Sequence, residues 1–463
     1  MTLRRSIALL AGACVLAVSQ TFAQQPALAA APGTAAAQTN VPAAQVMTLE
    51  AALQEMLAHN PQVVAAQQAV VAAQQNITVA RAGYGPTVTA NGQGAYGTTS
   101  SVLFTSAGTP VPLQNIAGTG TLSIGSNLPL YDSGKTQAAV SAAEAALASA
   151  QAGLRQTTQD TALSVATTFF TVLQAERLTT VREALLASAQ AQLALTQARV
   201  RAGVAAQSDV IQVQAQVAQA QVDLLTAQAQ IGTSKAALLA AVGLDAAEPV
   251  EVQAPGAPSL VVPVEASAAM QAAAANRPEI AKARAGVASG QAAVDQARIA
   301  AGMQLNVGVG ATYAPLSTSP ALNNSVSYGL TGTLSLPLFD AGKGQAGVAS
   351  AQASLHAAQA QLDAAVLTAR QSAYQAYLTA VQDAAQVTAT QAAQAAAEQA
   401  LRVAEGRYGA GVGTIVEVIT ARAQAAQAEV NAANAVYNYQ SALATLQHAQ
   451  GLPVQASVVG GGQ

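Results

Sequence analysis

The sequence predicts a mainly α-helical protein with a transmembrane β-barrel portion, and three observations lead to this fold class. The chain is duplicated, because the segment 127–136 returns as 335–344 and the segment 241–244 returns as 449–452 at the same offset. Four segments alternate apolar and small polar residues, which is the pattern of strands. Two long segments repeat apolar residues every seven positions, which is the pattern of supercoiled helices. Two copies of one large unit indicate a duplicated structure and not a solenoid of short repeats.

Residues 1–23 predict an export signal. A basic start precedes a short apolar run, and Ala23 ends a small-residue cleavage site. Cys14, the only cysteine, lies in this signal, and Ala11 stands where a lipoprotein signal has a larger aliphatic residue. Whether Cys14 is ever lipidated stays open. Cleavage leaves a mature chain without a thiol, so we expect no disulfide, thiol catalyst or thiolate metal site.

The rest of the chain divides at changes of composition and period. Residues 24–46 are rich in alanine, proline and glutamine and are expected to be a flexible lead-in. The first structural repeat covers 47–248 and the second covers 265–452, each with a helix, two strands and a long helical hairpin. A proline-rich linker, 249–264, separates them, and 453–463 is expected to be a flexible tail.

The composition favours helices that pack through small side chains. Hydrophobic residues make up 51% of the chain, but much of this is alanine, and aromatic residues make up only 3%. The net charge is −3 and no basic block occurs, which argues against nucleic acid as a partner. After the signal, no apolar run reaches the ~18 residues of a transmembrane helix.

The four strands are predicted at about 10–12 residues each, with one apolar face and one face of small polar residues. This length suits a tilted strand that crosses a bilayer. Loops rich in serine, threonine, glycine and proline are expected at 99–119 and 315–325. The strands cover 87–98, 121–130, 304–313 and 326–336.

A long helix follows each pair of strands. No proline interrupts the chain from Asp132 to Ala202, and at about 1.5 Å per residue such a helix is roughly 105 Å long. Asp132 and Asp340 are predicted to be the N-cap residues of the two long helices. Gly203 and Gly411 mark the turns at which each long helix reverses into an antiparallel partner.

Four strands per chain cannot close a barrel, and an open edge in hydrocarbon leaves backbone groups without hydrogen bonds. Several chains must therefore share one barrel. Two chains would give eight strands with an interior filled by side chains, and three would give twelve with room for a lumen. The small polar strand faces favour a wet interior. We therefore expect a homotrimer with a 12-stranded shared barrel that continues into a long α-helical coiled-coil barrel.

Several motifs, in a consistent order along the chain, carry a family resemblance. They are the strand-to-helix steps 129–135 and 337–343, the segment 166–175 on the first long helix, and the segment 407–418 at the second turn. Over residues 48–452 the chain resembles the TolC-like outer-membrane factor (outer membrane efflux protein) family. The resemblance implies a trimeric channel-tunnel in the outer membrane of a Gram-negative cell, with a helical barrel that extends through the periplasm.

The resemblance also implies a function and partners. It implies the exit duct of a tripartite efflux or type I secretion system, which passively conducts substrates from an inner-membrane pump and a periplasmic adaptor (membrane fusion) protein to the outside. The alternative is a periplasmic adaptor or coiled-coil scaffold protein, but such a protein needs no membrane-length strands. The sequence leaves open the transported substrate and the class of pump, whether RND, ABC or MFS.

The two helix turns are the first candidate site, because the resemblance implies adaptor contacts there. Exposed valine at a tight turn has little structural reason to occur, whereas the alternative is a plain helix C-cap without a partner. The candidate residues are Gly203, Val204, Ala205, Gly411, Val412 and Gly413.

The residues around these turns are a candidate periplasmic gate. Asp209 and Glu417 follow the two turns, and in a trimer each would form a ring of carboxylates that attracts cations. The resemblance implies that Asp209 and Tyr408 hydrogen-bond in a closed state and that Glu417 forms an acidic selectivity ring. Gly413 and Thr420 stand where the family pattern has an arginine lock and a second acidic ring, so we expect a looser gate and a weaker ring. The alternative is that Asp209 and Glu417 are ordinary solvated charges. Unchanged divalent-cation block of the channel current in the double variant Asp209→Ala with Glu417→Ala would support this alternative.

The strand-to-helix junctions are the third candidate site. An aromatic residue at this step suits a membrane interface, and simple packing at a kink is the alternative. The junction residues are Pro129, Tyr131, Asp132, Pro337, Phe339 and Asp340.

The sequence predicts no catalytic residue, no cofactor and no metal site. Ser133 to Thr136 mimics the end of a phosphate-binding loop, but Pro129 stands where that loop needs a glycine. The histidines are isolated on helices without the spacing of metal ligands. No nucleophile, base and orienting group assemble, which disfavours a secreted enzyme with a helical stalk.

Overall fold

The computed structural model describes residues 45–104, 108, 110–204, 206–256, 260–262, 264–300, 302–316 and 324–454. The predicted export signal with Cys14, most of the predicted lead-in, and Ala205 lie outside these residues. Within the described ranges, no helix combines the length and the apolar character that crossing a membrane requires.

The first repeat begins with two shorter helices, continues with a hairpin of strands and ends with a long helical hairpin. The hydroxyl of Thr48 accepts from the amide of Ala51 at 3.2 Å and so caps the first helix. The elements are α2 (Leu49–His59), α3 (Pro61–Arg81), the 3₁₀ turn η1 (Ala82–Tyr84), β2 (Thr87–Phe104), β3 (Pro110–Tyr131), α4 (Lys135–Arg201) and α5 (Gln207–Val242).

The second repeat has the same order of helices and strands. Its long helix α8 and the corresponding α4 each contain 67 residues, so the duplication extends to the length of the main helices. The elements are α6 (Ala266–Asn276), α7 (Pro278–Ile299), β5 (Gln304–Leu316), β6 (Ser325–Ser335), α8 (Lys343–Gly409) and α9 (Ile415–Ala449).

The long strands form one antiparallel sheet in the order β2-β3-β5-β6. β2 pairs with β3 from Thr87 opposite Asn127 to Phe104 opposite Pro110. The predicted loop at 99–119 is therefore wrong over most of its length, because strand pairing continues through it. Serine, threonine and glycine favour loops only when no partner strand is in register, and a partner is present here.

The alternation predicted for the strands is present in this sheet. Val309 pairs with Leu330 and Gly310 with Gly329, so large apolar side chains share one face and small ones share the other. Exposed apolar side chains on the first face are Val88, Leu122, Ile124, Val309, Tyr328 and Leu330. An open groove on the other face is lined by Thr87, Thr89, Asn127, Thr312, Ser327 and Thr331.

A small parallel pair of strands lies outside the duplicated pattern and was not predicted. β1 (Gln45–Met47) pairs with β4 (Val250–Val252), which ties the end of the predicted lead-in to the segment between the repeats. Met47 and Val250 are buried in the same apolar cluster. Three residues are too few to show a period of two in the sequence.

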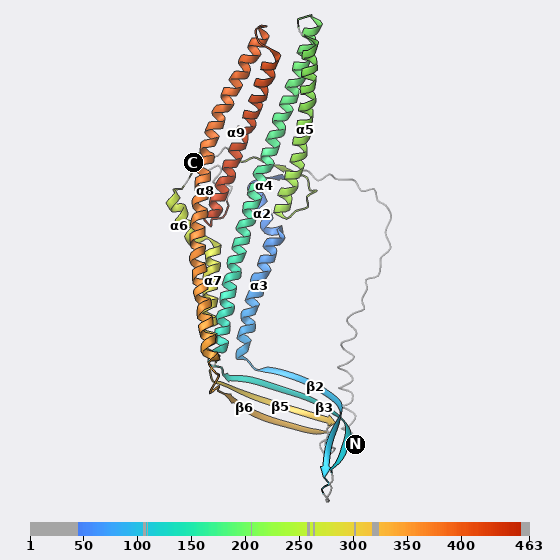
Figure 1. Ribbon diagram of the computed structural model, residues 1–463, viewed down its shortest axis with the longest axis vertical. Helices are drawn as coiled ribbons and strands as arrows, with labels where there is room; N and C mark the ends of the chain where they lie inside the picture. The colour runs from blue at the N-terminus through green and yellow to red at the C-terminus, as the bar shows by residue number, and fades with distance from the viewer. Residues whose placement is uncertain are drawn as a thin grey trace. The chain divides into compact units, whose positions relative to one another are not determined.

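α4 is the central helix of the described chain. It packs against α5 of its own hairpin, against α3 and α7, and against α9 of the second repeat, whereas α8 packs against α6, α7 and α9. In Figure 1 the hairpin turns lie at one end of the long helices and the sheet lies at the other. The turns and the sheet are therefore separated by the length of α4.

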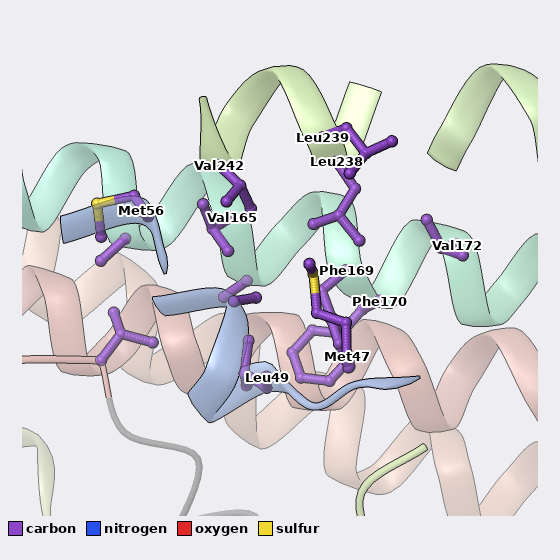
Figure 2. Packing of buried hydrophobic residues seen from close by; sticks show 14 of the residues in the cluster. Met47, Leu49, Met56, Val165, Phe169, Phe170, Val172, Leu238, Leu239 and Val242 are labelled. Atoms are coloured by element: carbon purple, nitrogen blue, oxygen red, sulfur yellow. The ribbon is translucent and has the colours of Figure 1, made fainter. Parts of the chain in front are cut away.

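Two apolar clusters hold the helices together, one centred on each repeat. The first joins β1, α2, α4 and α5, and Figure 2 shows Met47, Phe169 and Leu238 among its members. The rings of Phe169 and Phe170 meet edge to face with their centres 5.9 Å apart. The second cluster joins α6, α8 and α9 and consists mostly of alanine around Tyr439. This is the packing through small side chains that the composition predicts.

Each repeat places a glycine after its last helix against the break between its first two helices. Gly243 and Gly451 have positive φ of 98° and 72°. A Cβ at Gly243 would stand 2.7 Å from the Cα of Asn60, and one at Gly451 would stand 2.7 Å from the amide nitrogen of Arg277. The conformation and the close approach both require glycine, which explains why this motif recurs in the sequence.

Candidate functional site at the helix turns and the strand-to-helix junctions

The passage from strand to helix is the same tight turn in both repeats. Residues 133–134 have positive φ of 57° and 90°, and residues 341–342 have positive φ of 52° and 86°. In the first repeat the amide of Lys135 donates to the carbonyl of Asp132 at 3.0 Å. Two central residues with positive φ and this hydrogen bond define a type I′ turn. The recurring Asp-x-Gly-Lys sequence therefore encodes the turn.

Asp132 and Asp340 serve this turn, but the prediction that they are N-cap residues is wrong. α4 begins at Lys135 with Gly134 as its N-cap, so the aspartate stands two positions earlier. Its carboxylate accepts from the amide of Gly134 at 2.9 Å and from that of Thr136 at 2.7 Å. Asp340 accepts from the corresponding amides at 3.0 and 2.7 Å. The prediction assumed that the strand leads directly into the helix, whereas a turn intervenes.

These hydrogen bonds keep both carboxylates charged. Partial burial acts to raise the pKa of Asp132, but the hydrogen bonds from Thr136 and Gly134 outweigh it and hold the pKa below its ordinary value. The amides of Gly344 and Gly342 lower the pKa of Asp340 in the same way. The negative charges lie beside the N-termini of α4 and α8, where the helix dipole favours them.

The two junctions differ in what they contact. The hydroxyl of Ser133 donates to the carbonyl of Met303 at 2.7 Å. Gly302 leaves room for this contact, because a Cβ there would stand 2.5 Å from the Ser133 hydroxyl oxygen. Ala341, the counterpart of Ser133, is exposed. The second repeat thus covers the first junction, and the second junction is open in the isolated chain.

The other predicted junction residues lie at or close to the strand ends. Pro129 stands in β3 at a shift of register against β5, and Pro337 follows the end of β6. Tyr131 and Phe339 are both exposed. A role for these two rings at the membrane interface stays a prediction.

The helix turns are two copies of one C-terminal cap. Gly203 and Gly411 have positive φ of 73° and 78°. In each turn the glycine amide donates to the carbonyl three residues earlier, and the amide of the following valine donates to the carbonyl five residues earlier, at 2.9 to 3.2 Å. This is the Schellman motif, in which glycine takes the left-handed conformation. The predicted reversals are therefore confirmed at both glycines.

The residues that follow these glycines are accessible. Val204 is 73% exposed and Val412 is 70% exposed, while Ala205 lies outside the described residues. A Cβ at Gly413 would stand 3.1 Å from the Cβ of Arg407 and from the amide nitrogen of Tyr408, so the second turn is tight there. Contact of these residues with an adaptor stays a prediction.

Glu417 is held by its own hairpin. Its amide donates to the hydroxyl of Thr414 at 3.3 Å, and that hydroxyl donates to the Glu417 carboxylate at 3.3 Å, which caps the N-terminus of α9. Arg407 pairs with the other carboxylate oxygen at 3.3 Å. Part of the charge that Glu417 would bring to an acidic ring is therefore neutralised within the hairpin.

Tyr408 contacts an arginine that the sequence analysis did not single out. The guanidinium carbon of Arg199 lies 4.2 Å from the centre of the Tyr408 ring. Asp209 accepts from the hydroxyl of Ser208 at 3.4 Å. Among the described hydrogen bonds none joins Asp209 to Tyr408, so their pairing in a closed state stays a prediction.

A family model described as outer membrane efflux protein matches residues 52–244 and 269–452. The chain belongs to the outer membrane efflux protein family. The matched segments fall within the two repeats. Membership in this family means that the protein is an outer-membrane transport protein with a periplasmic extension and is not an enzyme.

Relatives of this efflux protein are found both by sequence and by fold. Protein CyaE of Bordetella pertussis is 28% identical over 300 residues, and the match spans 63% of this chain and 62% of that protein, less than two thirds of its length. A membrane protein from Pseudomonas aeruginosa superposes with a TM-score of 0.72 at 21% identity, covering 87% of this chain and 93% of that chain. The outer membrane protein VceC from Vibrio cholerae superposes with a TM-score of 0.71 at 22% identity, covering 88% and 97%. The resemblance and the fold class that the sequence predicts are confirmed.

Sequence reasoning could have found Arg199 of this efflux protein from the duplication. Its counterpart in the second repeat is Arg407, so both long helices carry a basic residue at the same position of the last turn. A basic last turn complements the helix dipole, which is the ordinary explanation of such a residue and points to no particular partner.

The described part of the efflux protein contains no cluster of three or more His, Cys, Asp or Glu side chains that could hold a metal ion. Each histidine instead lies beside a polar side chain. His448 lies 2.7 Å from Asp160, His59 lies 3.0 Å from Glu55, and His356 lies 3.2 Å from Gln359.

Proposed function

We propose that three copies of this protein form the exit duct of a tripartite efflux or type I secretion system. The duct passively conducts substrates from an inner-membrane pump and a periplasmic adaptor protein to the outside. A shared barrel of twelve strands crosses the outer membrane, and a helical barrel extends into the periplasm. Family membership supports an outer-membrane exit duct, and the unpartnered surfaces of the chain support the assembly.

The observation that carries the proposal is a difference in burial between two equivalent helices. Phe170 of α4 is 1% exposed, while Leu378, at the equivalent position of α8, is 46% exposed. Ala166 of α4 is 0% exposed, while its counterpart Tyr374 is 43% exposed. α8 presents apolar side chains where α4 is covered by protein, so α8 needs a cover that the described chain does not provide.

A second copy supplies this cover if the order of the repeats continues from chain to chain. α4 is covered by α7 and α9, which belong to the following repeat. In the same way, α3 and α5 of the next copy would cover α8. α5 has an exposed apolar stripe that suits this contact, formed by Ile211, Val222 and Leu225.

The sheet supports the same arrangement. β2 and β6 are its edge strands, and each edge presents backbone groups that hydrocarbon does not tolerate without partners. Pairing of β6 with β2 of the next copy gives every strand two neighbours. Two copies would give a barrel filled by side chains, whereas three leave a lumen lined by the small polar face and turn the apolar face to lipid.

The helix turns are the proposed periplasmic end of the duct. The exposed Val204 and Val412 are the proposed adaptor contacts, and Asp209, Tyr408 and Glu417 are the proposed gate. The alternative, a periplasmic adaptor or coiled-coil scaffold, gives no role to the four-stranded sheet and does not agree with the family.

Recording in planar lipid bilayers tests the proposal. The purified protein is expected to give discrete conductance steps and to have the mass of a trimer in native mass spectrometry. Leu378→Asp puts a charge on the exposed stripe of α8 and is expected to give a helical monomer without conductance, because an unpaired charge resists burial. Leu378→Met keeps the apolar contact and is expected to behave as the wild type. A monomeric wild type without conductance steps would rule the duct out.

A further inference from the structure

We propose that Arg199 is a latch that holds the two helix hairpins of one subunit together at the periplasmic tip. The proposal rests on the proposed function, since it assigns a residue to the gate of the duct. Its structural basis is the contact of Arg199, in the last turn of α4, with Tyr408, in the last turn of α8.

The contact between these residues has three attractive parts. The guanidinium carbon lies 4.2 Å from the ring centre, within the range of a cation–π interaction. The two terminal nitrogens donate long hydrogen bonds to the carbonyl of Tyr408, at 3.4 and 3.5 Å. The positive charge therefore lies at the C-terminal end of α8, where the helix dipole favours a cation.

The other described hydrogen bonds and ion pairs between the two hairpins lie farther from the turns. Arg422 of α9 donates to the carbonyl of Ser188 at 3.2 Å, and Arg177 pairs with Glu429 at 2.8 Å. Ser188 stands about three helical turns, roughly 16 Å, before Arg199 along α4. Among the described polar and cation–π contacts between the hairpins, that of Arg199 with Tyr408 therefore lies nearest the tip, where its loss would loosen the ends of both hairpins.

The duplication provides this latch once in each chain. Arg407 is the counterpart of Arg199, but it pairs with Glu417 inside its own hairpin. The counterpart of Tyr408 is Val200, so a neighbouring copy would offer Arg407 a valine and not an aromatic ring. The latch thus joins hairpins within a subunit and leaves the junctions between subunits without an equivalent.

The latch uses different groups of Tyr408 from the hydrogen bond that the family resemblance implies. A hydrogen bond between Tyr408 and Asp209 needs the phenolic hydroxyl, whereas the latch uses the face of the ring and the backbone carbonyl. Phenylalanine keeps both of these groups. Tyr408→Phe therefore distinguishes the latch from the hydrogen bond between Tyr408 and Asp209.

Single-channel recording of the full chain is the test. Arg199→Gln and Tyr408→Ala are expected to raise the open population by between about threefold and thirtyfold, as loss of one contact of this class implies. Tyr408→Phe is expected to raise the open population less than Tyr408→Ala does, because it keeps the ring face and the backbone carbonyl. Arg201→Gln is the matched control, because it removes the same charge from the same turn and Arg201 donates to Gln197 of its own helix.

Two results would overturn the latch: an unchanged open population in Arg199→Gln, or an increase of similar size in Tyr408→Phe. A second measurement does not depend on conductance. Spin labels at the exposed positions Val204 and Val412 are expected to report a longer and broader distance in Arg199→Gln than in Arg201→Gln. If the wild type shows no conductance steps, the proposed function fails, and the spin-label distances still decide whether the latch exists.

Discussion

Asp132 and Asp340 stabilise the starts of the two long helices through their negative charge. Each accepts two backbone amides in the turn that joins strand to helix. Because these bonds lower the pKa of both groups in the folded chain, folding favours the ionised form. This contribution is present above the ordinary carboxyl pKa of about 4 and is lost as the pH falls through the lowered value.

Asp132→Ala should therefore destabilise the protein at neutral pH and have little effect in acid. The expected loss is roughly 1 kcal/mol at pH 7, the size usual for a side chain that accepts from a backbone amide at the start of a helix. It should shrink as the pH falls through the lowered pKa, because the wild-type carboxyl then becomes protonated. Thermal unfolding followed by circular dichroism at neutral and at acid pH measures this.

Asp295→Ala is the control for this prediction, because Asp295 is partly exposed and its partners Arg298 and Gln291 lie on the same helix. Its effect should be small at both pH values. If Asp132→Ala costs the same stability in acid as at neutral pH, then the fit of the side chain matters and its charge does not.

Single residues were predictable from sequence where their chemistry is local. The aspartates and glycines of the turns act on amides a few positions away, so composition and spacing reveal them. Arg199 was missed because its partner Tyr408 belongs to the other repeat, and only the packing of two distant helices brings them together. The sequence indicates Glu417 and Arg407 separately but not their pairing, although both belong to one hairpin.

At the scale of elements, long periodic segments were predictable and short ones were not. The seven-residue spacing occurs in both halves of α4 and no proline interrupts the helix, so its end next to Gly203 follows from the sequence. β2 and β3 continue farther than predicted, because their outer halves contain the serine, threonine and glycine that also form loops. β1 and β4 are defined by their pairing with each other and have no sequence pattern of their own.

The contact between the end of α9 and the break before α7 gives a prediction at this scale. Gly451→Ala should destabilise the second repeat by roughly 1–3 kcal/mol, since it combines positive φ with a backbone approach of 2.7 Å to Arg277. Gly286→Ala should have the opposite sign and stabilise by about 0.5–1 kcal/mol. Gly286 lies inside α7, is exposed, and has no atom within 4 Å of the added Cβ among the described residues.

Thermal unfolding of both glycine variants in one detergent provides the comparison. The two substitutions add the same methyl group, so any effect of composition alone cancels. A Gly451→Ala protein as stable as Gly286→Ala would show that the end of α9 moves freely and does not hold the break in place.

At the scale of the whole molecule, the two repeats correspond residue by residue in the sheet. Thr87 pairs with Asn127 in the first hairpin, and Gln304 pairs with Ser335 in the second. Thr87 and Gln304 are the first residues of β2 and β5, and Asn127 and Ser335 are counterparts in the two repeats. The sheet also contains one junction between repeats, where Ser123 of β3 pairs with Thr312 of β5. That junction is a template for the contact of β6 with β2 of another copy.

The template predicts the register of the closed barrel. The counterpart of Ser123 on β6 is Thr331, and the counterpart of Thr312 on β2 is Ala95, so these two residues should lie opposite each other between neighbouring copies. The double variant Thr331→Cys with Ala95→Cys should therefore form disulfides between chains on mild oxidation, since opposite residues on antiparallel strands have Cβ atoms about 5 Å apart.

Denaturing gels of the oxidised protein distinguish the possible assemblies. A ring of three copies gives cross-linked dimers and trimers and no larger species, because each chain has two neighbours and the ring closes. Either single cysteine variant should give no ladder. Thr331→Cys with Asn91→Cys shifts the register by four residues, roughly 13 Å, and should not cross-link. Equal cross-linking of the shifted pair would reject the template, and a ladder that stops at dimers would reject three copies and with them a barrel wide enough to conduct.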